Sequence, residues 1–356
     1  MRILCLSRID GTSGHRIAAL RRLGHEVIVR DPYQAYSHYL KNRWTGAANY
    51  RTGYALLQGS MQRWTTSVVQ TAPEIDLVWI DHGELFGPKV VNSLRLLGKP
   101  VILYNVDDPT GTRDGHRFDS LRRALPHYDL CVVVRKENVA EFGSQGAVRV
   151  LRVWRSYDEV AHNPARAPRP VPARFCADVS FIGTWMRNEA RDAFLLSLAE
   201  RGLDIGIWGD RWQKSSLWLR LRPYWRGPSL DGADYLAAIQ GAKVCLGLLS
   251  KGNRDLHTQR SLEIPYAGGL LCAQRTSEHL ELYVEGEEAV FWSDASECAE
   301  KCLELLADSE KRSRIRVAGM RRVRQNGVGN EDICRQVLAA VAGWEGGAGE
   351  PLRPSV

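Results

Sequence analysis

The chain has 356 residues, of which 44% are hydrophobic and 25% charged, a composition typical of a globular protein with enough apolar material for two cores. Its formal net charge of +7 favours anionic partners such as nucleotide diphosphates, an anionic membrane or nucleic acid, but the basic excess is spread thinly. No apolar run approaches the roughly 18 residues of a membrane span, and Met1 leads directly into a predicted strand rather than a signal peptide. We therefore expect a cytoplasmic protein, at most peripheral to the inner face of the membrane.

The eight cysteines lie mostly in apolar segments. No C-x-x-C pair occurs, and no His/Cys spacing typical of a metal site recurs. We expect reduced cysteines that pack in cores, as in a cytosolic protein, and no bound metal.

The first half alternates predicted strands with predicted helices, which favours a parallel, doubly wound sheet. A turn-rich segment at 10–14 follows the first strand, and a helix is expected at 15–23. The region 33–70 is expected to be largely helical. Six strands are predicted, at 2–7, 26–30, 76–80, 100–105, 129–134 and 148–153.

Composition shifts at 162–174, where four prolines occur in thirteen residues without hydrophobic periodicity. The alternation of strands and helices then starts again, so a second Rossmann-like domain is expected. The expected division is 1–160 for the first domain, 161–175 for a proline-rich linker, 176–345 for the second domain and 346–356 for a flexible tail. Strands are predicted at 178–182, 205–208, 243–249, 270–273 and 289–292, with helices near 188–201, 232–242, 296–308, 310–325 and 330–344.

Two nucleotide-binding motifs are missing. The turn at 11–14 is not the G-x-G-x-x-G fingerprint of dinucleotide sites, and Asp31 is the only acid near the end of the second strand. No G-x-x-x-x-G-K-[ST] sequence occurs either. Neither a nicotinamide or flavin cofactor nor P-loop chemistry is expected.

A basic loop at 250–259, between two predicted strands, holds the strongest candidate site. Asp255 and Glu263, eight positions apart, carry carboxylates suited to sugar hydroxyls. Three cations suited to a diphosphate accompany them: Lys251, Arg254 and Arg260. Because open α/β sheets bind ligands at the carboxyl ends of strands, the pattern predicts a nucleotide-sugar site. The alternatives are a solvated basic rim and a glutamate that only complements the helix dipole.

The first strand of the second half ends in Gly183-Thr184-Trp185, where glycine permits close approach of a diphosphate and threonine can donate a hydrogen bond. Trp208 ends the next strand and is placed to contact a nucleoside. On the loop, Asp255 and His257 could meet the transferred sugar; a loop turn and a surface histidine are the alternatives. The full set expected to bind the donor is Gly183, Thr184, Trp185, Trp208, Lys251, Asn253, Arg254, His257, Thr258, Arg260 and Glu263.

Asp107 and Asp108 follow the fourth predicted strand, where a carboxylate could serve as general base toward an acceptor hydroxyl. Asp-Asp-Pro is also a good turn or helix-start sequence. His15 and His82 follow other strands of the same sheet and could orient an acceptor, act as the base or be structural. The predicted catalytic residues are Asp107, Asp108, His15 and Asp255.

The segment 212–226 mixes basic and aromatic residues. It could touch anionic lipid or stack on a nucleobase or sugar. The alternative is a helix and loop that pack their tryptophans against the second domain.

From 178 to 337 the chain resembles the CgeB-like (spore maturation protein type) glycosyltransferases of the GT-B fold. The motifs are, in order, DVSFIGTW, IWGDRW, YLAAIQGAKVCLGLL, KGNRDLHTQRSLEIPYAGG and EHLELYVEGEEAVFW. The first half matches weakly, chiefly at VDDP.

The resemblance implies an α/β chain with two Rossmann-like, doubly wound parallel-sheet domains that face a cleft. It also implies a nucleoside-diphosphate sugar donor on the second domain, an acceptor facing the first, and catalysis without an obligatory metal or other cofactor. In related enzymes with an E-x7-E motif, the second glutamate contacts ribose and the first contacts the donor sugar. Glu263 fits the second place, and Asp255, one methylene shorter, stands in the first. The motif is associated with retaining enzymes.

We predict a hexosyltransferase-like enzyme that moves a sugar from a nucleoside diphosphate to an unidentified acceptor, which could be a glycan, a lipid-linked species, a protein or a small molecule. The alternatives are a nucleotide-sugar epimerase or hydrolase, a non-catalytic sugar-nucleotide-binding protein, and a glycosyltransferase that modifies nucleic acid. The sequence contains no recognisable RNA- or DNA-binding module, so a nucleic-acid partner is not expected.

Overall fold

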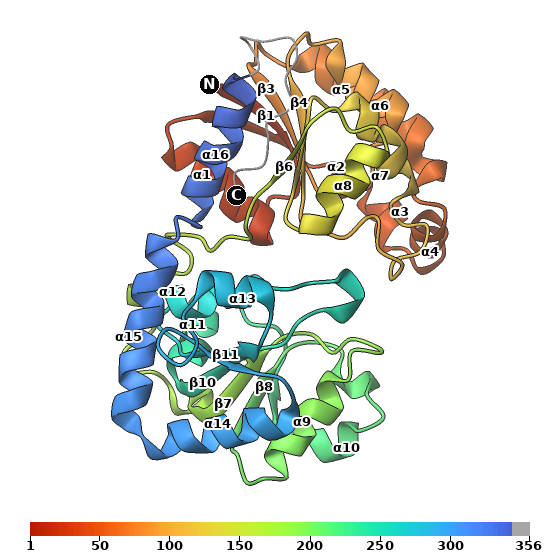
Figure 1. The fold of residues 1–356 in the computed structure, drawn as a ribbon. Coiled ribbons are helices and arrows are strands. Elements are labelled where there is room, and N and C mark those ends of the chain that lie inside the picture. The colour runs from red at the N-terminus through yellow and green to blue at the C-terminus, as the bar shows by residue number, and fades with distance from the viewer. Residues whose placement is uncertain (344–356) are drawn as a thin grey trace. The chain divides into compact units, whose positions relative to one another are not determined.

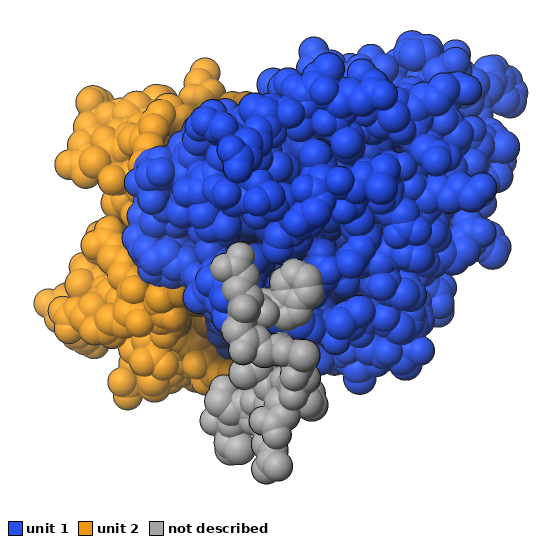
Figure 2. All heavy atoms as spheres, turned by 90° about the horizontal axis from the view of Figure 1, so that it is seen from above, with its two compact units in different colours: residues 1–154, 330–356 blue, residues 155–329 orange. Residues whose placement is uncertain are grey.

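The computed structural model describes residues 1–343, so the expected flexible tail at 346–356 lies outside the described residues. The chain forms two compact units, coloured separately in Figure 2. Unit 1 comprises 1–154 and the segment that begins at Asn330, and unit 2 comprises 155–329. This division differs from the boundaries expected from the sequence, because the last helix belongs to unit 1 and the proline-rich segment to unit 2.

Unit 1 is built on a six-stranded sheet in the order β2-β1-β3-β4-β5-β6 (Figure 1). All neighbouring strands are parallel. The six predicted strands are confirmed, because their apolar runs are buried by helices on both faces of the sheet. The strands are β1 (Arg2–Leu6), β2 (Glu26–Arg30), β3 (Leu77–Asp81), β4 (Val101–Asn105), β5 (Leu130–Val133) and β6 (Val150–Arg152).

The region 33–70 is helical, as expected, but it is broken into short helices. Asp31 caps one of them by accepting hydrogen bonds from the backbone N–H groups of Tyr33 and Gln34, and Asn42 caps another in the same way. Such side-chain caps start a new helix and so divide the segment. The helices of unit 1 are α1 (Gly11–Arg22), α2 (Pro32–Ala35), α3 (Ser37–Lys41), α4 (Arg43–Arg51), α5 (Gln58–Thr71), α6 (Pro88–Arg95), α7 (Asp119–Ala124), α8 (Lys136–Ser144) and α16 (Asn330–Ala342).

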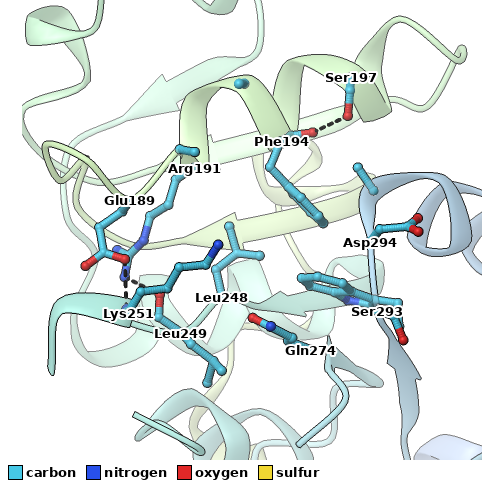
Figure 3. Close-up of a pocket in the computed structure, with 14 residues that line it drawn as sticks. Glu189, Arg191, Phe194, Ser197, Leu248, Leu249, Lys251, Gln274, Ser293 and Asp294 are labelled. Atoms are coloured by element: carbon cyan, nitrogen blue, oxygen red, sulfur yellow. Dashed lines mark hydrogen bonds between the residues drawn. The ribbon is translucent and has the colours of Figure 1, made fainter. Parts of the chain in front are cut away.

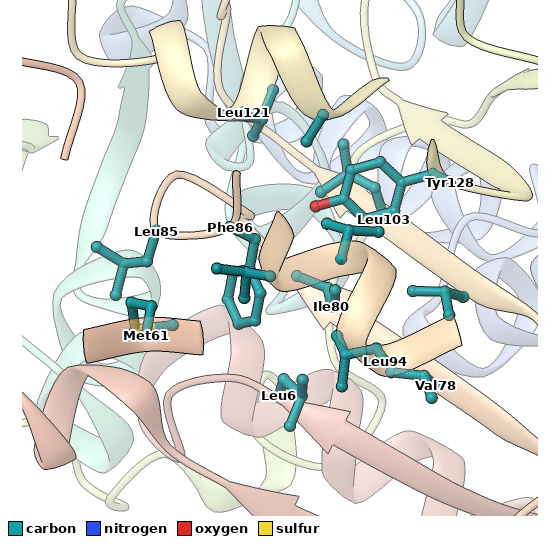
Figure 4. Packing of buried hydrophobic residues seen from close by; sticks show 14 of the residues in the cluster. Leu6, Met61, Val78, Ile80, Leu85, Phe86, Leu94, Leu103, Leu121 and Tyr128 are labelled. Atoms are coloured by element: carbon teal, nitrogen blue, oxygen red, sulfur yellow. The ribbon is translucent and has the colours of Figure 1, made fainter. Parts of the chain in front are cut away.

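Each face of the first sheet carries its own apolar cluster. On one face, side chains from the strands pack against α5 and α6, as Figure 4 shows for Met61, Ile80 and Leu94. On the other, Ile333 and Val337 of α16 join Ile3, Ile17 and Trp79. Helix α16 lies beside α1 (Figure 1), which is why the end of the chain belongs to unit 1.

Unit 2 is built on a second parallel sheet, in the order β12-β11-β10-β7-β8-β9. This is the usual order of a doubly wound fold, whose direction reverses between β7 and β10. Five strands match the predicted ones, and β9 was missed. The strands are β7 (Ala177–Ile182), β8 (Ile205–Trp208), β9 (Trp225–Gly227), β10 (Ala242–Gly247), β11 (Leu271–Gln274) and β12 (Val290–Trp292).

The helices of unit 2 are α9 (Arg191–Ala199), α10 (Trp218–Leu221), α11 (Gly232–Gln240), α12 (Arg260–Tyr266), α13 (Ser277–Leu282), α14 (Ala295–Ala307) and α15 (Ser309–Gln325). In the basic and aromatic segment at 212–226, Trp212 is fully buried and Trp225 lies in β9. These tryptophans therefore pack within the unit. Among residues 1–343, no helix is both long and apolar enough to cross a membrane.

The proline-rich segment expected to be a linker packs against unit 2. Gln240 of α11 donates a hydrogen bond of 2.9 Å to the carbonyl of Pro164. Phe175 is buried and lies 6.1 Å from Trp208, measured between ring centroids. Prolines in this segment fix the extended backbone between short 3-10 turns rather than marking a free connection.

Candidate active site

Glu263, the residue expected at the donor ribose, is held in a buried network of unit 2. Its Oε2 accepts hydrogen bonds from the Tyr235 hydroxyl at 2.6 Å and from Arg260 Nη1 at 2.7 Å. Its Oε1 makes one longer contact, 3.4 Å to His162 Nε2. Burial raises the pKa of Glu263, but the attraction of Arg260 and His162 and the bond from Tyr235 outweigh burial and leave the pKa below its usual value. The carboxylate is therefore ionised and aligned, and Oε1 keeps capacity to accept a further hydrogen bond.

Arg260 is the positive side of this network. Its guanidinium lies 4.9 Å from the centroid of the Tyr235 ring, and its side chain is 34% exposed. It is therefore paired with Glu263 yet still reachable from solvent. The sequence predicted Arg260 and Glu263, but Tyr235 and His162 come from distant segments and carried no signal of their own.

Asp255 and His257 are both fixed by Arg155, at the start of unit 2. Arg155 Nη2 lies 3.1 Å from Asp255 Oδ1, and the Arg155 backbone N–H donates to His257 Nε2 at 3.2 Å. His257 Nδ1 lies 2.6 Å from Glu278, and His257 is only 2% exposed. His257 is thus not a surface residue: both of its ring nitrogens are engaged, and it supports the loop.

The loop that follows β10 is fastened to the start of α9. The Glu189 carboxylate accepts hydrogen bonds from Ser250 Oγ at 3.1 Å, Lys251 N at 2.8 Å and Gly252 N at 3.2 Å. Arg191 donates to the carbonyls of Thr184 and Leu249, both at 3.0 Å. The sequence reasoning missed Glu189 and Arg191, although both lie shortly after the Gly-Thr-Trp motif.

The same loop carries the remaining expected donor residues. Asn253 ends a short 3-10 turn, and Arg254 has a left-handed backbone with φ of 53°. The backbone N–H of Thr258 donates to Ser261 Oγ at 3.0 Å, at the start of α12. The structure therefore brings Lys251, Asn253, Arg254, Thr258 and Arg260 to the carboxyl edge of β10.

The end of β7 is tightly packed against the end of β8. Gly183 accepts a hydrogen bond of 3.0 Å from the buried Trp212 indole, and a Cβ on Gly209 would lie 2.1 Å from the Gly183 carbonyl oxygen. Trp185 donates to Asp192 at 2.9 Å. Trp208 is 2% exposed; it is a core residue of the unit, and the expected open contact with a nucleoside is not what the structure shows for it.

At the carboxyl edge of the first sheet, the structure brings His82 and Asp107 together. His82 Nδ1 lies 3.5 Å from Asp107 Oδ2, and each side chain is 22% exposed. His82 Nε2 lies 3.3 Å from Ser13 Oγ. Burial lowers the pKa of His82. The interaction with Asp107 and the charge of Asp81 raise it by more than burial lowers it, so the net pKa is above its usual value.

The backbone at His82 is strained. Its φ is 66°, which is costly for a residue with a side chain. The turn is held because Asn105 Nδ2 donates to the His82 carbonyl at 2.6 Å. Asp81, the residue before His82, forms a buried ion pair with Arg16 at 2.8 Å. A strained, rigidly supported histidine at a strand end is a common feature of functional sites.

The other two predicted catalytic residues of this sheet lie differently. Asp108 is 2% exposed and accepts a hydrogen bond of 2.9 Å from Asn138, so it holds the turn, as the turn interpretation of Asp-Asp-Pro had it. His15 is half-buried on α1.

Three cysteines form a cluster that the sequence spacing did not reveal. Cys272 of β11 lies beside Cys298 and Cys302, one turn apart on α14, and their sulfur atoms all lie within 4.8 Å of one another. Three thiolates could hold a thiophilic metal ion. All three are also fully buried in the apolar cluster of unit 2, where cysteine packs as a small hydrophobic residue. Of the eight cysteines, Cys176 is exposed and the other seven are buried, and none of them forms a disulfide within residues 1–343.

Comparisons with solved structures identify the fold. The Anabaena protein HepE, solved with UDP, superposes with a TM-score of 0.66 at 14% identity over 96% of this chain and 100% of its own. Sucrose-phosphate synthase from Thermosynechococcus elongatus superposes with a TM-score of 0.68 at 13% identity, over 97% of this chain and 99% of its own. The UDP-forming α,α-trehalose-phosphate synthase from Burkholderia vietnamiensis superposes with a TM-score of 0.63 at 12% identity, over 96% of this chain and 99% of its own. The chain has the GT-B fold.

The expectation of two Rossmann-like parallel-sheet domains of GT-B type is thereby confirmed. Residues 187–338 also match a family model described as Glycosyl transferase-like. The matched segment contains Glu263 and the whole loop after β10. No curated protein matches the chain.

Proposed function

We propose that this protein is a glycosyltransferase that moves a hexose-like sugar from a nucleoside diphosphate to a hydroxyl acceptor. The observation that carries the proposal is the ionised, preoriented Glu263, paired with Arg260 beside the basic loop at the carboxyl edge of β10. The glycosyltransferase-like segment at 187–338 supports it. The CgeB-like grouping and a cytoplasmic location are part of the same proposal.

On the donor side, Glu263 Oε1 accepts the ribose hydroxyls, since Oε2 already serves Tyr235 and Arg260. Arg254 and Arg260 neutralise the charge that develops on the leaving diphosphate, a task that a metal ion performs in other enzymes. Lys251, the third cation expected there, lines a pocket of its own. Asp255, held by Arg155, contacts the sugar. Because structures of HepE hold UDP and UDP-glucose, UDP-glucose is the donor to try first.

On the acceptor side, unit 1 supplies the base. Asp107 Oδ2, 3.5 Å from His82 Nδ1, favours the tautomer with the proton on Nδ1, which leaves Nε2 with a lone pair for a proton. The acceptor O–H gives its proton to His82 Nε2, its oxygen bonds to the anomeric carbon, and the bond from that carbon to the diphosphate breaks with the electron pair leaving on the nucleotide. Ser13 Oγ lies 3.3 Å from Nε2, and the acceptor hydroxyl replaces this contact.

The first test is calorimetric titration with UDP, GDP, ADP, dTDP and CDP and their common sugar conjugates. One nucleotide should bind to the wild type and about tenfold or more weakly to Glu263→Gln, since a charge-assisted hydrogen bond contributes about 1.5 to 3 kcal/mol. Equal binding by a folded Glu263→Gln protein would refute the ribose role. Turnover of the bound donor with EDTA should equal turnover with added Mg²⁺ or Mn²⁺ if no metal is required.

Product analysis then separates transfer from its alternatives. Release of free sugar without any acceptor product would favour a hydrolase, and a changed sugar still attached to the nucleotide would favour an epimerase. Binding without any product, over a broad panel of acceptors, would favour a non-catalytic sugar-nucleotide-binding protein. The anomeric configuration of a transferred sugar, read by NMR, gives the stereochemical outcome that the substituted E-x7-E motif leaves open.

A further inference from the structure

A second feature of unit 2 lies apart from the Glu263 network. A pocket of about 440 Å³ opens at the carboxyl ends of β10, β11 and β12, between the starts of α9 and α14 (Figure 3). Its volume falls in the range of small-molecule sites. Among its lining residues only Lys251 belongs to the set predicted from the sequence to bind the sugar donor, and its side chain runs along this pocket (Figure 3). The proposed function therefore does not account for the pocket.

The floor of the pocket is apolar and aromatic. Phe194 of α9 and Trp292 of β12 lie with ring centroids 4.6 Å apart and planes inclined by 33°, and Leu248 lies next to them. Trp292 is 4% exposed, and its indole Nε1–H is buried without a hydrogen-bond partner within residues 1–343. The apolar, aromatic surface of the floor suits a flat ring.

The rim of the pocket is polar and carries two cations, Lys251 and Arg191, and two carboxylates, Glu189 and Asp294. The Lys251 ammonium makes no ion pair within the described chain, and Figure 3 shows its side chain running toward Leu248. The two rim carboxylates accept hydrogen bonds from neutral groups: Glu189 from three donors of the loop, and Asp294 from Glu297 N at 2.9 Å, where it caps α14. Because Lys251 makes no ion pair within the described residues, the group of a ligand that reaches it should be anionic.

We propose that this pocket binds a ring-bearing organic anion, such as an aromatic phosphate or carboxylate, at a site separate from the nucleotide donor. The ring lies on Leu248 and Trp292, and the anionic group pairs with Lys251. Because Glu189 and Arg191 join the pocket wall to the loop at 249–252, occupancy steadies the loop that carries the donor cations. The ligand thus acts as an effector of the donor site.

The test uses 1-naphthyl phosphate as probe, with inorganic phosphate for the anion alone and 1-naphthol for the ring alone. Calorimetry on the full chain should show 1-naphthyl phosphate binding about tenfold or more tightly than either fragment. Lys251→Met should weaken it about tenfold, and Ala193→Trp, which fills the pocket, should abolish it. Lys214→Met, outside the pocket, is the matched control and should leave it unchanged.

Competition with UDP decides whether the site is separate. Saturating UDP should leave one equivalent of 1-naphthyl phosphate bound. Displacement by UDP would overturn the proposal and make the pocket part of the donor site. Equal binding by wild type and Ala193→Trp would also overturn it, as would binding no stronger than that of the two fragments. These readouts stand whether or not any sugar transfer is detected, so a failure here is distinguishable from a failure of the proposed function.

Discussion

The Tyr235 hydroxyl donates a hydrogen bond of 2.6 Å to Glu263 Oε2, joining α11 to α12 beneath the basic loop. Tyr235→Phe keeps the ring under Arg260 but removes this bond to a charged acceptor. We expect a loss of about 1.5 to 3 kcal/mol in the free energy of unfolding, measured by urea denaturation. Tyr224→Phe, elsewhere in unit 2, serves as control, and equal stability of the two variants would show that the bond contributes little.

The depressed pKa of Glu263 makes its contribution to stability depend on pH. A carboxyl group whose folded pKa lies below its unfolded value, near 4.3, stabilises the fold above that unfolded value and loses the contribution as pH falls through the folded pKa. The wild type should therefore exceed Glu263→Gln in unfolding free energy at pH 7. The difference should shrink as the pH is lowered below about 4. A pH-independent difference would contradict this account.

The raised pKa of His82 has the opposite sign. Its stabilising contribution is fully present below the unfolded pKa, near 6.5, and is lost as pH rises through the folded pKa. Asp107→Asn should lower the His82 pKa, measured by NMR titration of the ring. The wild-type stability advantage over Asp107→Asn should be larger at pH 6 than at pH 8.5. If His82 is the base, the rate of transfer should rise with pH through the same pKa.

The loop at 250–252 depends on the Glu189 carboxylate. Glu189→Ala leaves the amides of Lys251 and Gly252 without their acceptor, so their hydrogen exchange should accelerate and donor affinity should fall about tenfold. Glu200→Ala, which removes an exposed pairing with Arg220, is the matched control and should change neither. Unaltered exchange in Glu189→Ala would mean that the loop is held by other contacts.

Gly209 allows the ends of β7 and β8 to approach each other. Its φ is 145°, and a Cβ there would lie 2.1 Å from the Gly183 carbonyl oxygen. Gly209→Ala should cost about 1 to 3 kcal/mol or more and disturb the turn expected to bind diphosphate. Gly143→Ala, on α8 with no atom near the added methyl, should be neutral or stabilising. Thermal denaturation of the two variants makes the comparison.

The sequence was most informative where local pattern decides the structure. Eleven strands could be predicted because each is a short apolar run with turn signals on both sides. Strand β9 was missed because Trp225–Gly227 is a three-residue edge strand in a segment of mixed charge and aromatic residues. The period of α16 predicted a helix, but the pattern does not say which sheet it covers, so its assignment to unit 1 needed the structure.

The candidate site shows the same limit. The strand-end rule located Glu263, Arg260 and Asp107, because the rule depends only on order along the chain. It misassigned Trp208, since it does not say whether the last side chain of a strand points out or into the core. It also missed Tyr235 and the pairing of His82 with Asp107, because those contacts join segments that only tertiary folding brings together.

Helix α16 covers one face of the first sheet, although it follows the whole of unit 2 in the sequence. Residues 155–329 are thus an insertion within unit 1, and Tyr157 and Gly329, near its two ends, form an isolated parallel bridge. The two ends of the insertion therefore lie close together. A fragment that stops at Trp154 would expose the apolar surface that Ile333 and Val337 cover and is expected to aggregate, whereas a short linker from Trp154 to Asn330 would restore that cover and yield unit 1 as a separate protein.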